Sequence, residues 1–118
     1  MSAPVPELPA GVALDLAALP LEFEPVPAAQ RTAGEPETGY AVLGTLGEAE
    51  LGVWEMTTGG MRDVEVDEVF VVLDGRATVA FEDGRPSVEL APGVLVQLTA
   101  GDRTVWTVRQ RIRKLVVS

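Results

Sequence analysis

The sequence predicts an all-β fold, a single-domain antiparallel β-barrel or sandwich, on three observations. Short apolar runs begin about every ten residues from Thr38 onward, which is typical of barrels and sandwiches. Turn residues separate these runs, and no run has the apolar period of a helix. The expected strands are 40–46, 49–56, 61–66, 69–73, 77–81, 87–90, 94–98, 104–108 and 113–117.

Turns containing glycine are expected at the breaks between these strands. Glycine accepts the positive φ that tight hairpins demand, so an Asp-Gly pair between two apolar runs favours a hairpin. The breaks fall at Gly47-Glu48, Thr57–Gly60, Asp74-Gly75, Asp83-Gly84, Pro92-Gly93 and Ala100-Gly101.

Residues 1–37 are predicted to form a Pro-rich N-terminal arm that packs on the barrel or on a partner, and residues 38–118 the barrel domain. Seven of the nine prolines lie in the arm, and the missing N–H and fixed φ of proline exclude long helices and central strands there. A fully disordered arm is the alternative.

Two local features are expected within the arm. Asp15 is placed to cap one short turn through Leu16–Leu19, which Pro20 closes. The apolar residues Leu19, Leu21 and Phe23 alternate with other residues, which favours an edge strand lying along the barrel.

Histidine and cysteine are both absent, and this narrows the chemistry more than any other count. Disulfides, thiolate nucleophiles, Ser-His-Asp triads and imidazole metal sites are therefore excluded. Any acid–base chemistry falls to a carboxylate of raised pKa, to the only lysine, Lys114, or to the only tyrosine, Tyr40.

Charge and hydropathy exclude further classes of partner. Eighteen acidic and nine basic residues give a net charge of −9, so phosphate backbones repel the chain and no nucleic-acid partner is expected. No apolar run approaches the ~20 residues of a membrane helix. Residues 1–11 lack the basic residues and apolar block of a signal peptide. We therefore expect a cytoplasmic protein with no membrane partner.

A basic run near the C-terminus consists of Arg109, Arg111, Arg113 and Lys114. Because the chain as a whole is acidic, we interpret this run as an edge strand guarded by charge, or as a pairing surface for the acidic arm.

Residues 38–118 resemble the cupin superfamily, and more narrowly its small single-domain branch of ureidoglycine aminohydrolase-like and ethanolamine-utilisation cupins. The motifs that carry the resemblance are Trp54-Glu55, Thr57-x-Gly59, Asp67-Glu68, Leu73-x-Gly75, Pro92-Gly93, Ala100-Gly101 and Trp106–Val108. The resemblance implies a jelly-roll barrel, also called a double-stranded β-helix, and a homodimer.

The resemblance also implies four metal ligands, of which only the glutamate, Glu68, is present. The expected histidine positions hold Arg62 and Val64, or Met61 and Asp63 with a longer gap, and Thr104. One carboxylate does not hold a transition metal, so we expect no metal and no other cofactor. The metal-dependent dioxygenase and isomerase activities of the superfamily therefore do not carry over.

Strand alternation predicts the lining of a pocket inside the barrel. If Glu68 faces the interior, residues of the same parity on either side of it face the interior too. Residues of one parity on the strand near 104–108 join them. The candidate ligand-binding residues are Arg62, Val64, Glu68, Phe70, Thr104 and Trp106.

The polar centre of this pocket is an expected ion pair between Arg62 and Glu68. A buried charge needs a partner, and a pair that lines a cavity also orients a polar ligand beside Trp54 or Trp106. The alternative is a purely structural pair, with the aromatic residues as core.

An acidic cluster at Asp63, Glu65, Asp67 and Glu68 suggests a calcium site. Residues of opposite parity on a strand point to opposite faces, so these four carboxylates are not all expected to converge. We interpret them as a solvated acidic strand edge with Glu68 facing inward.

Three functions remain open from the sequence. The first is a metal-free cupin that binds a small polar metabolite in the barrel or serves as an interaction module. The second is a metal-independent hydrolase or isomerase of small metabolites, with Glu68 as acid or base and Arg62 as anion holder. The third is a structural dimer with a filled barrel.

Overall fold

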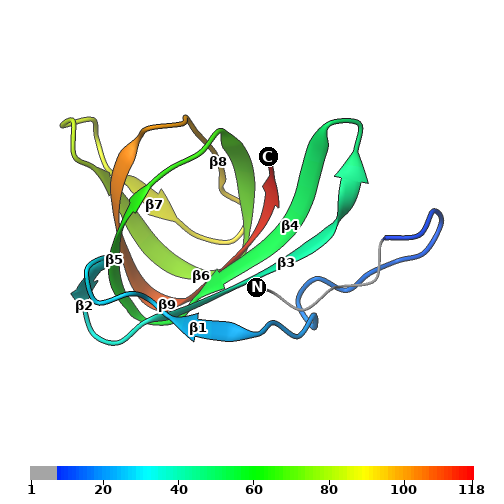
Figure 1. Ribbon diagram of the computed structural model, residues 1–118, viewed down its shortest axis with the longest axis horizontal. Coiled ribbons are helices and arrows are strands. Elements are labelled where there is room, and N and C mark those ends of the chain that lie inside the picture. The colour runs from blue at the N-terminus through cyan, green and yellow to red at the C-terminus, as the bar shows by residue number, and fades with distance from the viewer. Residues whose placement is uncertain (1–7) are drawn as a thin grey trace.

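The computed structural model describes residues 8–118, and its regular structure consists of nine β-strands (Figure 1). The strands are β1 (Phe23–Pro25), β2 (Arg31–Ala33), β3 (Glu37–Leu46), β4 (Ala49–Met56), β5 (Gly59–Val64), β6 (Glu68–Phe81), β7 (Val88–Leu90), β8 (Leu95–Leu98) and β9 (Arg103–Val117). All pairings are antiparallel. The prediction of an all-β fold is confirmed.

The two longest strands, β6 and β9, pair with each other and hold the barrel together. The first half of β6 pairs with residues 113–117 of β9, and its second half pairs with residues 104–108. In one wall of the barrel, β9 pairs with β4, β4 with β3, and β3 with β1. In the same wall, β6 pairs with β8. In the other wall, β9 pairs with β5, and β5 with β2. In this wall, β6 pairs with β7. All nine strands are hydrogen-bonded into one continuous sheet, which curls into a barrel (Figure 1). Its two walls, which share β6 and β9, are called its two sheets below.

Both central strands are continuous where the sequence predicts a break. Asp74-Gly75 lies inside β6, so the expected hairpin there is wrong. The register against β9 shifts between Val72 and Ala77, and Gly75 has a φ of 98°. A Cβ at Gly75 would collide with the backbone of Arg111. The positive φ of this glycine therefore serves a bulge that bends β6 from one sheet into the other.

Four of the remaining glycine turns follow the prediction, whereas the break at Thr57–Gly60 is shorter than predicted because β5 begins at Gly59. Gly47, Gly84, Gly93 and Gly101 all have a φ in the left-handed region and lie between strands. The strand 49–56 has the predicted bounds.

The described part of the predicted arm, residues 8–37, contacts the barrel at several points. Ala17 N donates to Asp15 Oδ1 at 3.0 Å, so the predicted turn at Asp15 is confirmed. β1 pairs with β3 and β2 pairs with β5. Residues 1–7 of the predicted arm lie outside the described residues, and the division of the chain at residue 38 stays a prediction.

The basic run near the C-terminus is not an edge strand, because β9 lies inside both sheets. Arg113 Nη1 donates to the carbonyls of Leu16 and Leu19 at 2.6 and 2.8 Å. Arg113 Nε also donates to Glu55 Oε1 at 2.6 Å, on the outer face of the sheet. The edge-strand interpretation was wrong, and the alternative, a pairing surface for the arm, fits the Arg113 contacts.

Apolar side chains from both sheets fill most of the barrel interior. The fully buried ones with the largest volumes are Trp106, Phe70, Met56, Leu90, Leu98 and Ile112. In residues 8–118 no helix is long and apolar enough to cross a membrane.

Candidate functional site

A small cavity of ≈ 80 Å³ lies at one end of this core, and we name it the Lys114 cavity. Its lining comes from β3, β4, β5, β6, β9 and the 65–67 connection, and consists of Tyr40, Trp54, Asp63, Glu65, Glu68, Trp106, Lys114 and Val116. Tyr40, Trp54 and Asp63 are partly exposed, so the cavity is open to solvent on their side.

Lys114 is the centre of the cavity and is 4% exposed. Its Nζ lies 3.1 Å from Glu68 Oε2. The same nitrogen lies 4.6, 4.1 and 4.7 Å from the ring centroids of Trp54, Phe70 and Trp106. Burial lowers the pKa of Lys114, while the carboxylate of Glu68 and the three rings favour its cationic form.

Alternation along β9 explains how a lysine enters the core. Ile112, Lys114 and Val116 share one parity and face inward, whereas Arg113 faces the arm. Trp54 of β4 is the register partner of Lys114, and Phe70 of β6 is that of Val116. Aromatic residues of the neighbouring strands therefore pack against the inward side chain of Lys114.

Glu65 is buried, and its carboxylate is held from two sides. Its Oε2 accepts hydrogen bonds from Thr104 Oγ1 at 2.5 Å and from Trp106 Nε1 at 3.0 Å. Its backbone N–H donates to the carbonyl of Asp102, and its carbonyl accepts from the N–H of Gly101. These contacts fix the side chain of Glu65 toward the interior.

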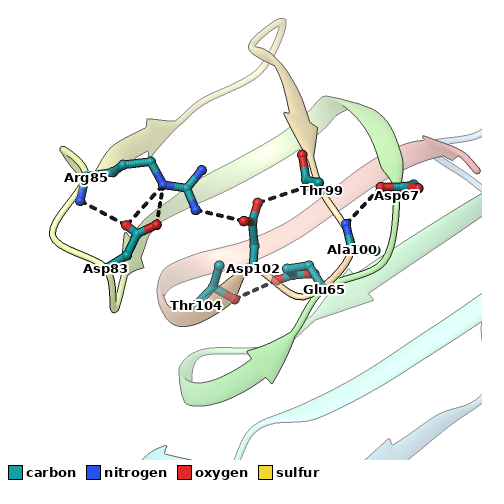
Figure 2. A network of polar contacts seen from close by, with 8 residues as sticks. All are labelled: Glu65, Asp67, Asp83, Arg85, Thr99, Ala100, Asp102 and Thr104. Atoms are coloured by element: carbon teal, nitrogen blue, oxygen red, sulfur yellow. Dashed lines mark hydrogen bonds and ion pairs between the residues drawn. The ribbon is translucent and has the colours of Figure 1, made fainter.

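A polar network holds the loops beside Glu65 in place (Figure 2). Asp102 accepts hydrogen bonds from Arg85 Nη2 at 2.8 Å and from the N–H of Thr99 at 3.0 Å. Asp67 accepts a hydrogen bond from the N–H of Ala100 at 2.8 Å. The 65–67 connection and the 99–102 turn are therefore tied together, which makes the cavity wall at Glu65 rigid.

Asp63 and Tyr40 complete the polar lining. Burial, together with the negative charge of Glu65, raises the pKa of Asp63 to about 6. The hydroxyl of Tyr40 donates to Glu50 Oε2 at 2.8 Å, and burial raises its pKa. Asp63 is therefore a carboxyl that exchanges protons near neutral pH.

The cavity has spare acceptors. In the hydrogen bonds of residues 8–118, Oδ2 of Asp63 and Oε1 of both Glu65 and Glu68 receive no donor. No fully buried side-chain nitrogen or oxygen in this part of the chain lacks a partner, so these oxygens are reached by solvent. A bound molecule with hydroxyl or N–H donors can satisfy them.

A family model describing the EutQ-like cupin domain matches residues 43–115. This chain belongs to the EutQ-like cupin family. No curated protein matches it.

Solved structures share the cupin fold at low sequence identity. A protein of unknown function from Pseudomonas syringae superposes with a TM-score of 0.73 at 24% identity, over 88% of this chain and 46% of that one. The Clostridium difficile EutQ protein superposes with a TM-score of 0.59 at 24% identity, over 70% of this chain and 61% of that one. A putative ethanolamine utilization protein Q from Salmonella typhimurium superposes with a TM-score of 0.59 at 15% identity, over 85% of this chain and 95% of that one. This cupin thus spans less than two thirds of the Pseudomonas and Clostridium proteins.

The side chains of this cupin do not fit a bound transition metal. Glu68 Oε2 holds the ammonium of Lys114, and the hydroxyl of Thr104 donates to Glu65. Of the positions where histidine is usual, Arg62 and Val64 are exposed. Across residues 8–118 there is no group of three or more His, Cys, Asp or Glu that could hold a metal ion.

The predicted pair of Arg62 and Glu68 is not formed. Arg62 is exposed and Val64 is 57% exposed, so neither faces the interior. On β5 and as far as Glu65, the odd-numbered residues face inward, and the 65–67 connection resets the parity before Glu68. The prediction carried one strand parity through a segment that contains a loop.

The four carboxylates of the acidic cluster do not all converge, as expected, but the interpretation as a solvated strand edge is wrong for Asp63 and Glu65. Asp63, Glu65 and Glu68 all line the Lys114 cavity, and Asp67 is tied to Ala100 instead. The 65–67 connection lets Glu65 and Glu68, which differ in parity, face one cavity.

The other predicted residues lie at or behind the cavity. Glu68 and Trp106 line it. Phe70 touches the Lys114 ammonium from behind, and Thr104 holds Glu65. Residue-by-residue patterns missed Asp63, Glu65, Tyr40, Val116 and Lys114 as pocket residues. A signal for Lys114 existed, namely a single lysine at an inward position of the apolar run 112–117.

Proposed function

We propose that this cupin binds a small polar molecule in the Lys114 cavity, without a metal ion. The observation that carries the proposal is a solvent-reached cavity with spare carboxylate oxygens around a buried ammonium. A few polar groups on an aromatic wall are typical of small-ligand sites. The cavity also speaks against a barrel filled throughout by side chains.

The charges of the cavity indicate the chemistry of the ligand. Three carboxylates, Asp63, Glu65 and Glu68, face one lysine. A ligand carrying carboxylate or phosphate would meet repulsion, whereas hydroxyl, amide or amine donors would meet acceptors. We therefore expect a small neutral or weakly basic molecule rich in donors.

A thermal-shift screen of the metal-free protein against small alcohols, amides, amines, carbonyl compounds and acids tests the proposal. Donor-rich neutral compounds should raise the melting temperature, because a ligand that binds only the native state stabilises it. Val116→Phe fills the cavity and should abolish the shift, while Val117→Phe, on the opposite face, should leave it unchanged. No shift with any compound would overturn the proposal.

Acid–base catalysis is the second candidate function, and Asp63 is the group that favours it. A carboxyl with a pKa of about 6 beside a lysine of lowered pKa provides a proton acceptor and a proton donor in one cavity. Glu68, the acid or base expected from the sequence, has one oxygen committed to Lys114. Turnover of a bound compound that Asp63→Asn abolishes would establish this function.

The homodimer, the cytoplasmic location and the absence of a nucleic-acid partner remain proposals. The homodimer rests on what the cupin resemblance implies. The net charge of −9 supports the absence of a nucleic-acid partner. Light scattering that gave a monomer of 12.5 kDa at high concentration would contradict the dimer.

A further inference from the structure

The amine of Lys114 combines features that make a lysine a nucleophile rather than a surface charge. It is the only lysine in the chain, it is 4% exposed, and it lines a cavity open to solvent. Lysines desolvated in apolar pockets react in their neutral form with carbonyl compounds to give Schiff bases. Aromatic rings at 4.1–4.7 Å exclude water from one side of the nitrogen.

We propose that Lys114 captures a small neutral aldehyde or ketone in the Lys114 cavity as a Schiff base. The inference rests on the proposed function, because it names the chemical class of the molecule that the cavity binds.

The cavity supplies a partner for each proton that moves. Glu68 Oε2, 3.1 Å from Nζ, takes the proton of the ammonium, and the neutral nitrogen then adds to the carbonyl carbon. A C–N bond forms, the C=O π bond breaks, and the oxygen takes a proton from the adding nitrogen to give a neutral carbinolamine. Asp63, whose pKa of about 6 leaves part of it protonated, gives a proton to the hydroxyl, which leaves as water.

The product keeps the charge of the site. The lone pair of nitrogen forms the C=N bond as water leaves, and the protonated imine carries the positive charge that the ammonium carried. The rings of Trp54, Phe70 and Trp106 that face the ammonium face the imine too, so cation–π attraction stabilises both states. No oxidant or reductant is required.

Size and charge restrict the carbonyl compound. A volume of ≈ 80 Å³ holds on the order of five non-hydrogen atoms. The carboxylates of Asp63, Glu65 and Glu68 repel keto acids and accept hydrogen bonds from hydroxyl groups. Short hydroxyaldehydes and hydroxyketones therefore fit best.

Borohydride trapping with glycolaldehyde tests the inference on the intact protein near neutral pH. Reduction converts the imine into a stable secondary amine, which mass spectrometry locates by peptide mapping. The matched control is Lys114→Arg/Arg109→Lys, which moves the single lysine to an exposed position on the same strand. Because burial lowers the pKa of Lys114, a larger share of its amine is neutral, and Lys114 should be trapped faster than a lysine at position 109.

The outcomes separate this inference from the proposed function. Rapid modification at Lys114, absent in Lys114→Arg, supports the Schiff base. Modification at Lys114 no faster than at position 109 overturns it, and so does labelling confined to the N-terminal amine.

If a non-carbonyl compound raises the melting temperature while glycolaldehyde leaves Lys114 unmodified, the inference fails and the proposed function stands. If neither compound binds, both fail. Circular dichroism of the variants confirms that each is folded, and the wild-type peptide map requires no variant.

Discussion

Two ion pairs on β9 have similar lengths and opposite surroundings. Arg109 Nη2 lies 2.8 Å from Glu89 Oε2, with side chains 50% and 69% exposed. Lys114 Nζ lies 3.1 Å from Glu68 Oε2, with side chains 5% and 10% exposed. The shorter pair is the one that water screens, so burial rather than distance decides which of the two matters for folding.

Breaking the buried pair should give the largest effect. Glu68→Ala and Lys114→Ala should each lower the free energy of unfolding by ~3–5 kcal/mol, because each leaves a buried charge without its partner. The double variant should lose clearly less than the sum of the two. Denaturant melts of the four proteins measure this.

Arg62→Ala, at an exposed position, serves as the control and should change stability by less than about 0.5 kcal/mol. Small and additive losses at 68 and 114 would contradict the buried pair.

Titrating Asp63 should give an intermediate effect that depends on pH. Its pKa is raised from 3.8 to about 6 in the folded chain, so between these values the folded state binds more protons than the unfolded state. Stability from this group is therefore present at low pH and is lost as pH rises through about 6. Asp63→Asn should be more stable than wild type by ~1–2 kcal/mol above this window, and the difference should vanish below it. Thermal melts across pH check the sign, and a pH-independent difference would exclude this origin.

The exposed pair should give the smallest effect. Arg109→Ala and Glu89→Ala should each change the free energy of unfolding only slightly, and added salt should reduce the change further. Salt should change the loss in Glu68→Ala much less, because the side chains of that pair are only 5% and 10% exposed. A loss at Arg109 as large as that at Lys114 would mean that burial is not the deciding variable.

The fold could be predicted from the sequence because its signals are local. Apolar runs and glycine turns act within a few residues, and they located most strand segments. The merging of two expected strands into β6 could not be read this way. Asp74-Gly75 has the composition of a hairpin, and only the close approach of Arg111 makes it a bulge.

The site was predictable only where strand parity is uninterrupted. Phe70, Thr104 and Trp106 lie on continuous strands, and all three are buried as expected. Arg62 and Val64 lie across the 65–67 connection from Glu68, where a loop reverses the parity. The partner of Glu68 is Lys114, 46 residues away in the chain, and no local pattern joins the two.

The sharing of β9 between both sheets has a consequence for synthesis of the chain on the ribosome. β4 and β5 pair with β9 rather than with each other, and β6 pairs with it along both halves. Until residues 103–117 have left the exit tunnel, these earlier strands present unpaired edges, and neither sheet can close. Such long-range pairing makes folding slow and leaves the nascent chain open to aggregation. Folding of this barrel should therefore wait until β9 has emerged, and a nascent chain stalled before residue 103 should be a substrate for chaperones that hold exposed strands.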